Sequence, residues 1–184
     1  MLSLSLWLMI KYALYDYVPQ RNLKRASFED MERHRRILDF KDGRNYAVKW
    51  AARELCKALS LMDLSQTVLV FIPACCKRTN DRRFKKFSAM VCERLGSVNG
   101  FDYVQVVGKR RKAHIDHVHE QDGFVQIDKS QLAGKEVIVV DDIVTSCQTA
   151  NAFIDKIVSA GAKVRMAVFL AKTKSYRRSR YSYS

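Results

Sequence analysis

Short apolar runs along the chain predict the strands of a buried sheet. TVLVFIP, residues 67–73, is apolar and rich in β-branched side chains, and a proline ends it. Three further segments favour strands: residues 101–107, 135–142 and 162–171. Apolar runs of this length are typical of parallel strands that are covered on both faces. We therefore predict four strands of a central, mostly parallel sheet.

Between these runs, apolar residues recur at helical spacing. The three faces that they form are Ala47, Trp50, Ala51, Leu55, Ala58 and Leu59; Phe84, Phe87, Ser88, Val91, Cys92 and Leu95; and Ala150, Phe153, Ile154, Ile157 and Val158. Gly96 and Gly161 follow the second and third faces, where glycine commonly ends a helix. Strands that alternate with helices predict an α/β fold with right-handed crossovers. Ligands of such folds bind beyond the carboxyl ends of the strands.

The ends of the chain differ from this alternating region. The chain opens with MLSLSLWLMI, which lacks a basic leader and is too short to span a bilayer. We expect it to begin a buried strand or helix, with an export or membrane segment as the alternative. The tail, residues 173–184, is polar and basic, and we expect it to be disordered. The whole chain of 184 residues fits one domain.

Composition and charge narrow the class of protein. With 48% apolar residues, seven glycines and two prolines, the sequence is globular and not fibrous or disordered. Its net charge of +14 indicates an anionic partner, such as nucleic acid, anionic lipid or a polyphosphate substrate. The five cysteines include no CxxC pair, which argues against a disulfide framework or a zinc knuckle. Free thiols fit a reducing cytoplasm.

The stretch VIVVDDIVTSCQT, residues 137–149, carries the clearest chemistry. Asp141 and Asp142 follow four apolar residues, and neighbouring strand residues point to opposite sides. One carboxylate can therefore face a crevice, while the other faces supporting structure or a metal-bound water. Thr145, Ser146 and Thr149 surround the start of the next helix, where backbone N–H groups and the helix dipole favour phosphate. This pattern predicts a ribose 5-phosphate site, with simple helix capping as the alternative.

The same stretch resembles the phosphoribosyl pyrophosphate (PRPP) signature of type I phosphoribosyltransferases. Residues 37–172, including ILDFKDGRNYAVKWAARELCKAL and VFIPACCKRTNDRRFKKFSAMVCERLG, are similar to the ComF-like branch, which is associated with DNA uptake. The zinc-binding cysteines that often open ComF-like chains are missing. The resemblance implies an α/β fold of the type I phosphoribosyltransferase class: a central, mostly parallel sheet flanked by helices. It further implies a small N-terminal hood in residues 1–62 and the transferase core in residues 63–172.

The resemblance also implies a role for each part of the site. Asp141 and Asp142 would hold the ribose hydroxyls, directly or through Mg²⁺ and water. The 5-phosphate loop would comprise Thr145, Ser146, Cys147, Gln148 and Thr149. The pyrophosphate would be held by Pro73, Ala74, Cys75, Lys77, Arg78, Arg82, Arg83, Lys109, Arg110 and Arg111. Lys112 and His114 would join the two aspartates as catalytic residues, on a mobile loop that closes over the substrate.

The implied reaction transfers a phosphoribosyl group to or from a nitrogenous base, with pyrophosphate as leaving group. Mg²⁺ is the implied cofactor, and the protein would be a cytoplasmic homodimer without membrane contact. Thr145 stands where purine-acting members carry an acid, so the acceptor base stays open. Cys147 stands where the signature has glycine. Its Cβ would cost about 1–2 kcal/mol in a left-handed conformation, and it predicts weak or unusual PRPP binding.

Three alternatives remain open on the sequence alone. The protein could be a non-catalytic accessory that senses nucleotides or binds nucleic acid through basic residues near Tyr103 and the tail tyrosines. Cys76 and Arg82 match the Cys-x5-Arg spacing of thiolate phosphatases, but the loop has no glycine. A third possibility is a metal site formed by His114, Asp116, His117, His119 and Glu120.

Overall fold

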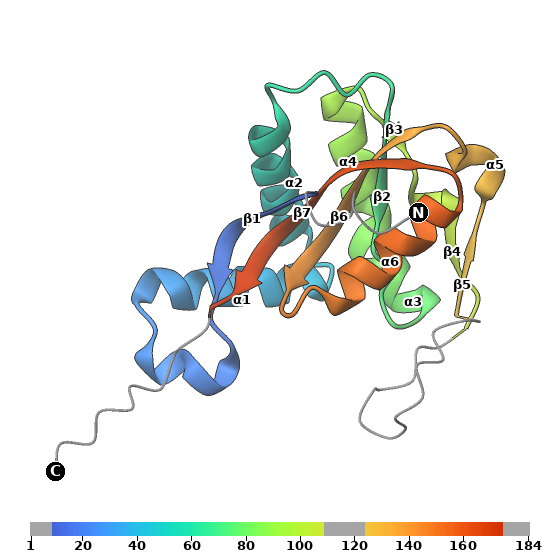
Figure 1. Ribbon diagram of the computed structural model, residues 1–184. Helices are drawn as coiled ribbons and strands as arrows, with labels where there is room; N and C mark the ends of the chain where they lie inside the picture. Colours follow the sequence, from blue (N-terminus) through green and yellow to red (C-terminus); the bar gives the residue numbers. More distant parts are fainter. Residues whose placement is uncertain (1–8, 109–123, 175–184) are drawn as a thin grey trace, which may run out of the picture.

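The computed structural model describes residues 9–108 and 124–174. Several predictions fall outside these ranges: the first eight residues, most of the tail, the loop cations Lys109–Lys112, His114, and the histidine-rich metal hypothesis. Within the described ranges, the elements are shown in Figure 1.

The core of the molecule is a five-stranded parallel sheet with the order β1-β7-β6-β2-β3. Its strands are β1 (Ile10–Tyr17), β2 (Thr67–Phe71), β3 (Val98–Asn99), β6 (Glu136–Val144) and β7 (Lys163–Thr173). The strands expected at residues 67–73, 135–142 and 162–171 are confirmed. β6 lies at the centre between β2 and β7, so the stretch that carries the two aspartates runs through the middle of the sheet.

The segment 101–107 does not form a strand of this sheet, and that prediction was wrong. It contains the short 3-10 helix η4 (Phe101–Tyr103) and the strand β4 (Val104–Val106), which pairs antiparallel with β5 (Val125–Ile127) in a separate sheet. β4 has alternating buried and exposed residues, as an edge strand of either sheet would. Its hydrogen-bonding partner follows residues 108–123, and no local pattern identifies it.

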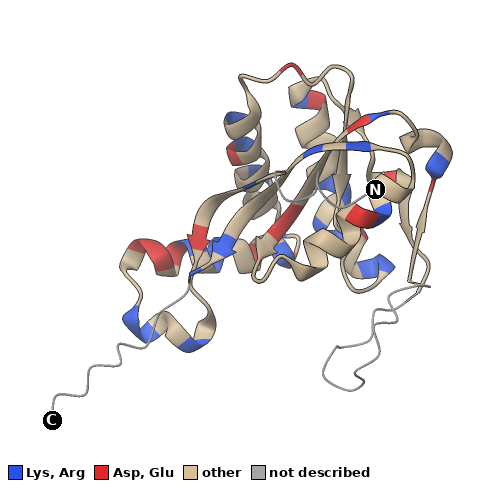
Figure 2. Cartoon of the chain, viewed as in Figure 1, with Lys and Arg blue, Asp and Glu red and all other residues tan. Residues whose placement is uncertain are grey.

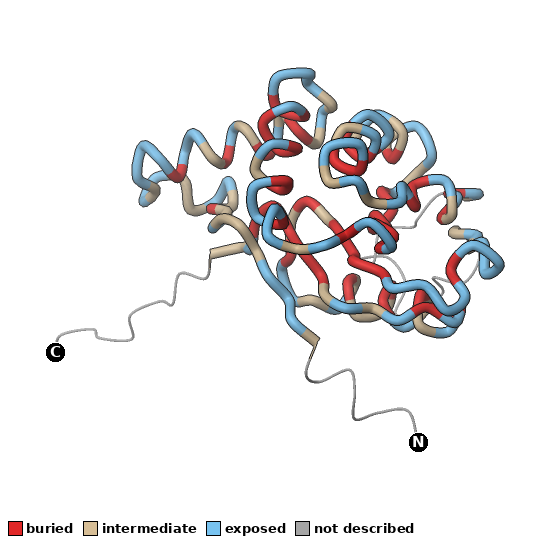
Figure 3. Tube along the Cα trace, turned by 90° about the horizontal axis from the view of Figure 1, so that it is seen from above, coloured by how far each residue is buried: buried red, intermediate tan, exposed pale blue. Residues whose placement is uncertain are grey.

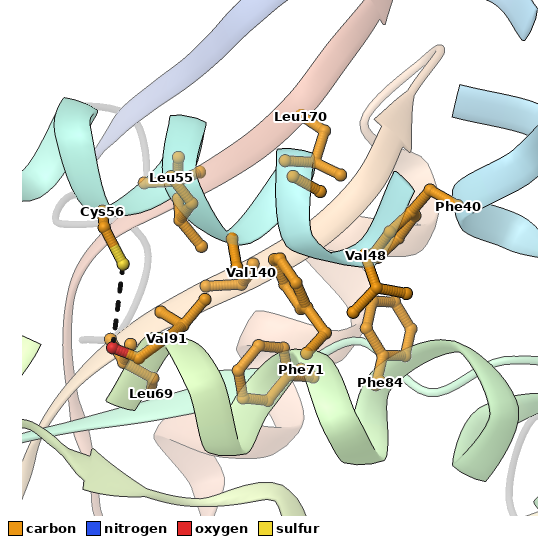
Figure 4. Close-up of a cluster of buried hydrophobic side chains, with 14 of the residues drawn as sticks. Phe40, Val48, Leu55, Cys56, Leu69, Phe71, Phe84, Val91, Val140 and Leu170 are labelled. Atoms are coloured by element: carbon orange, nitrogen blue, oxygen red, sulfur yellow. Dashed lines mark hydrogen bonds between the residues drawn. The ribbon is translucent and has the colours of Figure 1, made fainter. Parts of the chain in front are cut away.

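One face of the sheet packs against α1 (Phe28–Lys41), α2 (Asn45–Leu59) and α4 (Lys86–Leu95). Figure 4 shows the side chains that fill this layer, among them Phe40, Phe71, Phe84 and Val140. Phe40 and Phe87 meet edge to face, with their ring centroids 5.0 Å apart. The burial of each such ring stabilises the folded protein by roughly 1.5–3 kcal/mol. The predicted face of α2 is buried except for Ala58, which is exposed.

The opposite face is covered by α6 (Gln148–Ser159), with α5 (Lys129–Leu132) and β4 beside it. Val137 and Val139 point to this face, whereas Ile138 and Val140 point to the first. Figure 3 shows the buried strands between their more exposed helices. Since β6 alternates in this way, the next two residues, Asp141 and Asp142, begin on opposite faces of the sheet.

The helix boundaries follow their expected signals. α4 ends at Gly96 with φ 64°, and α6 is followed by Gly161 with φ 90°, both left-handed conformations that glycine adopts without strain. α4 continues from α3 (Lys77–Asn80) through the π-helical turn η3 (Asp81–Lys85). Such turns rotate the following side chains and are frequent at functional sites.

Residues of the expected hood also build the central body. β1 pairs with β7 along the edge of the sheet, and α2 supplies much of one core layer. The 3-10 helix η2 (Gln20–Arg25) and α1 lie between them in sequence. The boundary at residue 62 stays a prediction. In the described ranges, every helix is too short or too polar to cross a bilayer.

Candidate functional site

A cavity lies where β6 passes into α6, at the carboxyl end of the central strand. Its volume is about 190 Å³. The residues around it are Asp141, Ile143, Val144, Thr145, Cys147, Gln148, Thr149, Ala150 and Phe169. Four of the five predicted phosphate-loop residues and one of the two predicted aspartates therefore meet at one cavity. The fifth, Ser146, is exposed beside it, and its hydroxyl lies 3.4 Å from Oε1 of Gln148.

The N-terminal end of α6 borders this cavity. Cys147 is the N-cap residue, and its side chain accepts no capping hydrogen bond. The residues that commonly cap helices, Thr145 and Ser146, precede that position, so the simple capping interpretation does not account for them. The N-terminal end of this twelve-residue helix carries partial positive charge. The local geometry suits an anion.

Cys147 adopts a left-handed backbone conformation, with φ 62° and ψ −3°. Among the described residues, it is the one non-glycine with positive φ. The loop therefore does require the conformation that glycine would adopt freely, as expected from the sequence. Holding a side chain there costs about 1–2 kcal/mol, and the residue also forms part of the cavity wall.

Asp141 is the acidic residue of the cavity. One of its oxygens, Oδ1, accepts a hydrogen bond from the backbone N–H of Asp142 at 2.7 Å. Burial, and then the negative charge of Asp142, hold the pKa of Asp141 well above its ordinary value. The ionised carboxylate is therefore short of favourable partners in the ligand-free protein. Hydroxyl donors or a cation in the cavity would supply them.

Asp142 faces the other side of the sheet and is only 3% exposed. Its carboxylate forms ion pairs with Lys41 of α1 at 3.1 Å and with Arg83 of the π-helical turn at 2.8 Å. The backbone N–H of Ile143 also donates to it at 2.6 Å. The expectation that the two carboxylates diverge is confirmed. The structure places Asp142 among internal cations, and its ribose contact stays a prediction.

Sequence reasoning missed two residues of this second cluster, Lys41 and Tyr17. Lys41 ends α1, where a basic residue commonly lies in solvent and complements the helix dipole. Tyr17 ends β1 and stacks on His34 at 5.1 Å. Its pKa is raised by burial and then by the charge of Asp142. Both approach Asp142 only through tertiary folding, and the local sequence offers no signal for that.

The predicted pyrophosphate loop follows the neighbouring strand β2. Pro73 and Ala74 are buried and Cys75 is exposed. The loop is held on both sides: the N–H of Ile72 donates to the Val140 carbonyl at 2.9 Å, and the N–H of Ala74 donates to Oδ1 of buried Asn80, also at 2.9 Å. The loop is thereby fixed beside β6, next to the strand that carries the aspartates.

The four basic residues after this loop take different positions. Lys77 and Arg78 are exposed, with Lys77 paired to Asp81 at 2.5 Å. Arg82 lies against the turn between α1 and α2, since a Cβ at Gly43 would come within 2.7 Å of its Cγ. Arg83 is directed inward to Asp142. Lys77, Arg78 and Arg82 are therefore the exposed cations of this set, and Lys77 and Arg78 follow the loop most closely in sequence.

Metal ligands are sparse in the described part of the chain. It contains no group of three or more histidine, cysteine or acidic side chains placed to hold an ion. All five cysteines are free thiols. Cys76, the thiol of the phosphatase interpretation, lies 3.3 Å from the hydroxyl of Thr79.

Comparison with protein families assigns the fold. The phosphoribosyl transferase domain matches residues 65–184, which is more than half of the chain. The chain belongs to this family. The five-stranded parallel sheet with helices on both faces confirms the type I phosphoribosyltransferase fold expected from the sequence. The matched region contains β2, β6 and α6, and so both loops described above.

Solved phosphoribosyltransferases show more distant similarity. Adenine phosphoribosyltransferase from Thermoanaerobacter pseudethanolicus has 23% identity and a TM-score of 0.46, with 70% of each chain covered. Hypoxanthine phosphoribosyltransferase from Staphylococcus aureus has 17% identity and a TM-score of 0.40, covering 73% of this chain and 70% of that one. UMP synthase from Leishmania donovani has 17% identity and a TM-score of 0.44 over 68% of this chain, which spans only 22% of that protein. No curated protein matches the chain.

Proposed function

We propose that this member of the phosphoribosyltransferase family binds PRPP with Mg²⁺ and transfers its phosphoribosyl group to, or from, a nitrogenous base. The observation that supports this most is the cavity at the β6–α6 junction. It brings the carboxylate of Asp141 to the N-terminal end of α6, with Thr145 and Thr149 beside it. A carboxylate suits the ribose hydroxyls, and the helix end suits the 5-phosphate.

The residues present fit Mg²⁺ as a cofactor shared with substrate. Mg²⁺ is commonly bound through one or two carboxylates together with substrate phosphates and water. Asp141 is a carboxylate of this kind, with a raised pKa that a nearby cation would lower. When bound, Mg²⁺ would neutralise charge on the pyrophosphate.

The proposed reaction is a displacement at C1 of the ribose. The bond between C1 and the pyrophosphate oxygen breaks, a bond between C1 and the base nitrogen forms, and the proton of that nitrogen passes to water or to the departing pyrophosphate. The protein has to orient the two partners, neutralise the leaving group and exclude water. In this scheme the α6 N-terminus holds the 5-phosphate and Asp141 orients the ribose. Lys77 and Arg78 are exposed beside the β2 loop, where they can attract the pyrophosphate.

Finer assignments are part of the same proposal. We place the chain in the ComF-like branch because of its basic segment after the β2 loop, residues 77–86. A homodimer and a cytoplasmic location complete the proposal, and the five free cysteines fit a reducing compartment. The roles of Asp142, Lys112, His114 and the other loop cations also stay proposals.

Calorimetric titration with PRPP, with and without Mg²⁺, tests the proposal, followed by a screen of nucleobases for pyrophosphate release. Asp141→Asn should weaken PRPP binding at least about tenfold, because it removes a charged acceptor. It should not destabilise the protein, since the raised pKa shows that the buried charge is unfavourable without ligand.

Asp155→Asn on the exposed side of α6 is the matched control and should bind PRPP normally. Wild-type protein that fails to bind PRPP would refute the proposal. Salt-sensitive oligonucleotide binding in that case would favour the non-catalytic, nucleic-acid-binding alternative.

A further inference from the structure

A second cavity lies on the helices α1 and α2. Its volume is about 330 Å³, which is within the lower range for small-molecule sites, about 300–1,000 Å³. The residues around it are Glu32, Arg35, Arg36, Tyr46, Trp50 and Arg53. It shares no residue with the cavity at β6 and α6. Three arginines face one glutamate, so the lining is cationic, and Figure 2 shows how basic positions recur along α2.

A rigid aromatic stack supports this cavity. The ring of Trp50 stacks on Tyr15 of β1 at 5.8 Å, and the guanidinium of Arg36 lies 5.9 Å from the Trp50 ring. Arg36 also pairs with Glu32 at 3.3 Å, which fixes its orientation. Trp50 is only 9% exposed, whereas Tyr46 is 50% exposed. Tyr46 is therefore the aromatic ring that a planar ligand can reach.

The other two arginines have donors to spare. The side chains of Arg35 and Arg53 are 80% and 62% exposed. Each meets its carboxylate through Nε: Arg35 with Asp39 at 3.8 Å, and Arg53 with Glu54 at 3.0 Å. Each guanidinium has five N–H donors, and the exposure of both side chains keeps donors accessible to a ligand.

The two carboxylates are themselves shared with other groups. Asp39 also forms an ion pair with Arg44 at 2.8 Å and accepts a hydrogen bond from the hydroxyl of Tyr46. Glu54 accepts a hydrogen bond from the hydroxyl of Tyr15 at 2.7 Å. Their negative charge is thus distributed over several donors and only partly offsets Arg35 and Arg53. Exposed guanidinium groups match the oxygens of a phosphate group, because their N–H donors are arranged in a planar fork.

We propose that this cavity binds a nucleoside phosphate, with the phosphate held by Arg35 and Arg53 and the base against Tyr46. An isolated anion would use only the arginines, whereas a ligand with both a phosphate and a flat ring uses the exposed arginines and the exposed ring of Tyr46. The ligand is either a free nucleotide or one nucleotide of a strand. The inference does not depend on the transferase function, because the two cavities are built from different residues.

Titration of the full chain with AMP, followed by calorimetry and tryptophan fluorescence, tests this site. The double variant Arg35→Gln/Arg53→Gln should bind AMP at least about tenfold more weakly, because two charge-assisted contacts are lost. The control Lys49→Gln/Lys57→Gln removes two exposed charges from α2 outside the cavity and should bind AMP like the wild type. Circular dichroism establishes that each variant is folded.

Two further variants separate this site from the β6–α6 loop. Tyr46→Ala should weaken binding of AMP and leave binding of inorganic phosphate unchanged. Thr149→Val should leave intact the AMP binding that depends on Arg35 and Arg53, whereas any AMP held through its ribose 5-phosphate at the β6–α6 loop would be lost as a separate component of the titration. Loss of AMP binding in Thr149→Val together with normal binding by the double arginine variant would place AMP at the transferase loop and overturn the proposal.

A short single-stranded oligonucleotide distinguishes the two sources of ligand. If it binds more tightly than AMP and displaces it, the site takes one nucleotide of a strand. If AMP binds and the oligonucleotide does not, the site takes a free nucleotide. If neither binds, or both bind the double arginine variant as well as the wild type, the proposal is wrong.

Discussion

Cys147 shows how a single backbone conformation affects a binding loop. Its φ of 62° is left-handed, a conformation that costs a residue with a Cβ about 1–2 kcal/mol. Glycine removes this strain, but it makes the unfolded chain more flexible and so raises the entropic cost of folding by up to about 1 kcal/mol. Cys147→Gly should therefore change the free energy of unfolding little, and it should tighten PRPP binding several-fold by clearing the cavity wall. Calorimetry and urea denaturation measure the two effects.

Cys147→Ala separates the backbone from the sulfur atom. It keeps the Cβ, so it should retain the strain and bind PRPP no more than slightly better than the wild type. Equal tightening by alanine and glycine would show that the sulfur, and not the conformation, limits binding. Unchanged affinity in both variants would show that the cysteine is harmless.

At the scale of residues, the sequence was sufficient to predict the site residues that lie close together along the chain. Asp141, Thr145, Cys147 and Thr149 fall within one short stretch, and they meet at one cavity. Lys41 reaches Asp142 from a helix far away in sequence. A lysine in the last turn of an amphipathic helix has the same local pattern whether it is solvated or paired, so its contact was not predictable.

Among the elements, Asp142 joins three that are distant in sequence. It lies on β6 and binds Lys41 from α1 and Arg83 from the π-helical turn. Arg83→Met should lower the free energy of unfolding by about 2 kcal/mol, since it leaves a buried carboxylate with one cation fewer. Lys41→Met should cost less, because the Lys41 side chain is 29% exposed and partly screened by water. Urea denaturation provides both values.

Lys86→Met is the matched control for these changes. Lys86 is exposed and donates a hydrogen bond to the side chain of Asn45, so its loss should alter stability by no more than about 0.5 kcal/mol. In an Asp142→Asn background, Arg83→Met should also cost less than in the wild type, as a double-mutant cycle would reveal. Additive losses would contradict a coupled ion-pair cluster.

Strands with both faces buried were predictable, and edge strands were not. β2, β6 and β7 contain continuous apolar runs because both of their faces lie under helices. β4 has only three residues and alternates, and its partner β5 comes only after the polar residues 109–123 in sequence. β1 begins near the apolar start, but Ile10 and Tyr12 are exposed on it. At the edges, the choice of partner comes from tertiary packing.

For the whole molecule, the expected hood of residues 1–62 and the expected core share one hydrophobic cluster. Val48 and Leu55 of α2 pack in one cluster with Phe71, Phe84 and Val140 of the later segment (Figure 4). The full chain should therefore unfold in one cooperative transition, with circular dichroism and tryptophan fluorescence giving the same midpoint. A fragment of residues 63–184 should lack fixed tertiary structure, because it loses this layer.

Two separate transitions, or a fragment with sharp thermal unfolding, would instead support an independent core. A chain of residues 9–184 serves as the control, since it keeps all described elements and should unfold like the full protein. The fragment's near-ultraviolet spectrum gives a second measure, because it reports packed aromatic side chains.

The pairing of β1 with β7 sets an order for folding during synthesis. Ile10 is made early, but its neighbour in the sheet is Met166, near the end of the described chain. Until β7 has left the ribosome, β1 has no partner, and β6 lacks the strand beside it. Contacts that span most of the chain also slow folding. The central sheet can therefore be completed only after β7 has been made, and the nascent protein carries β1 unpaired until then.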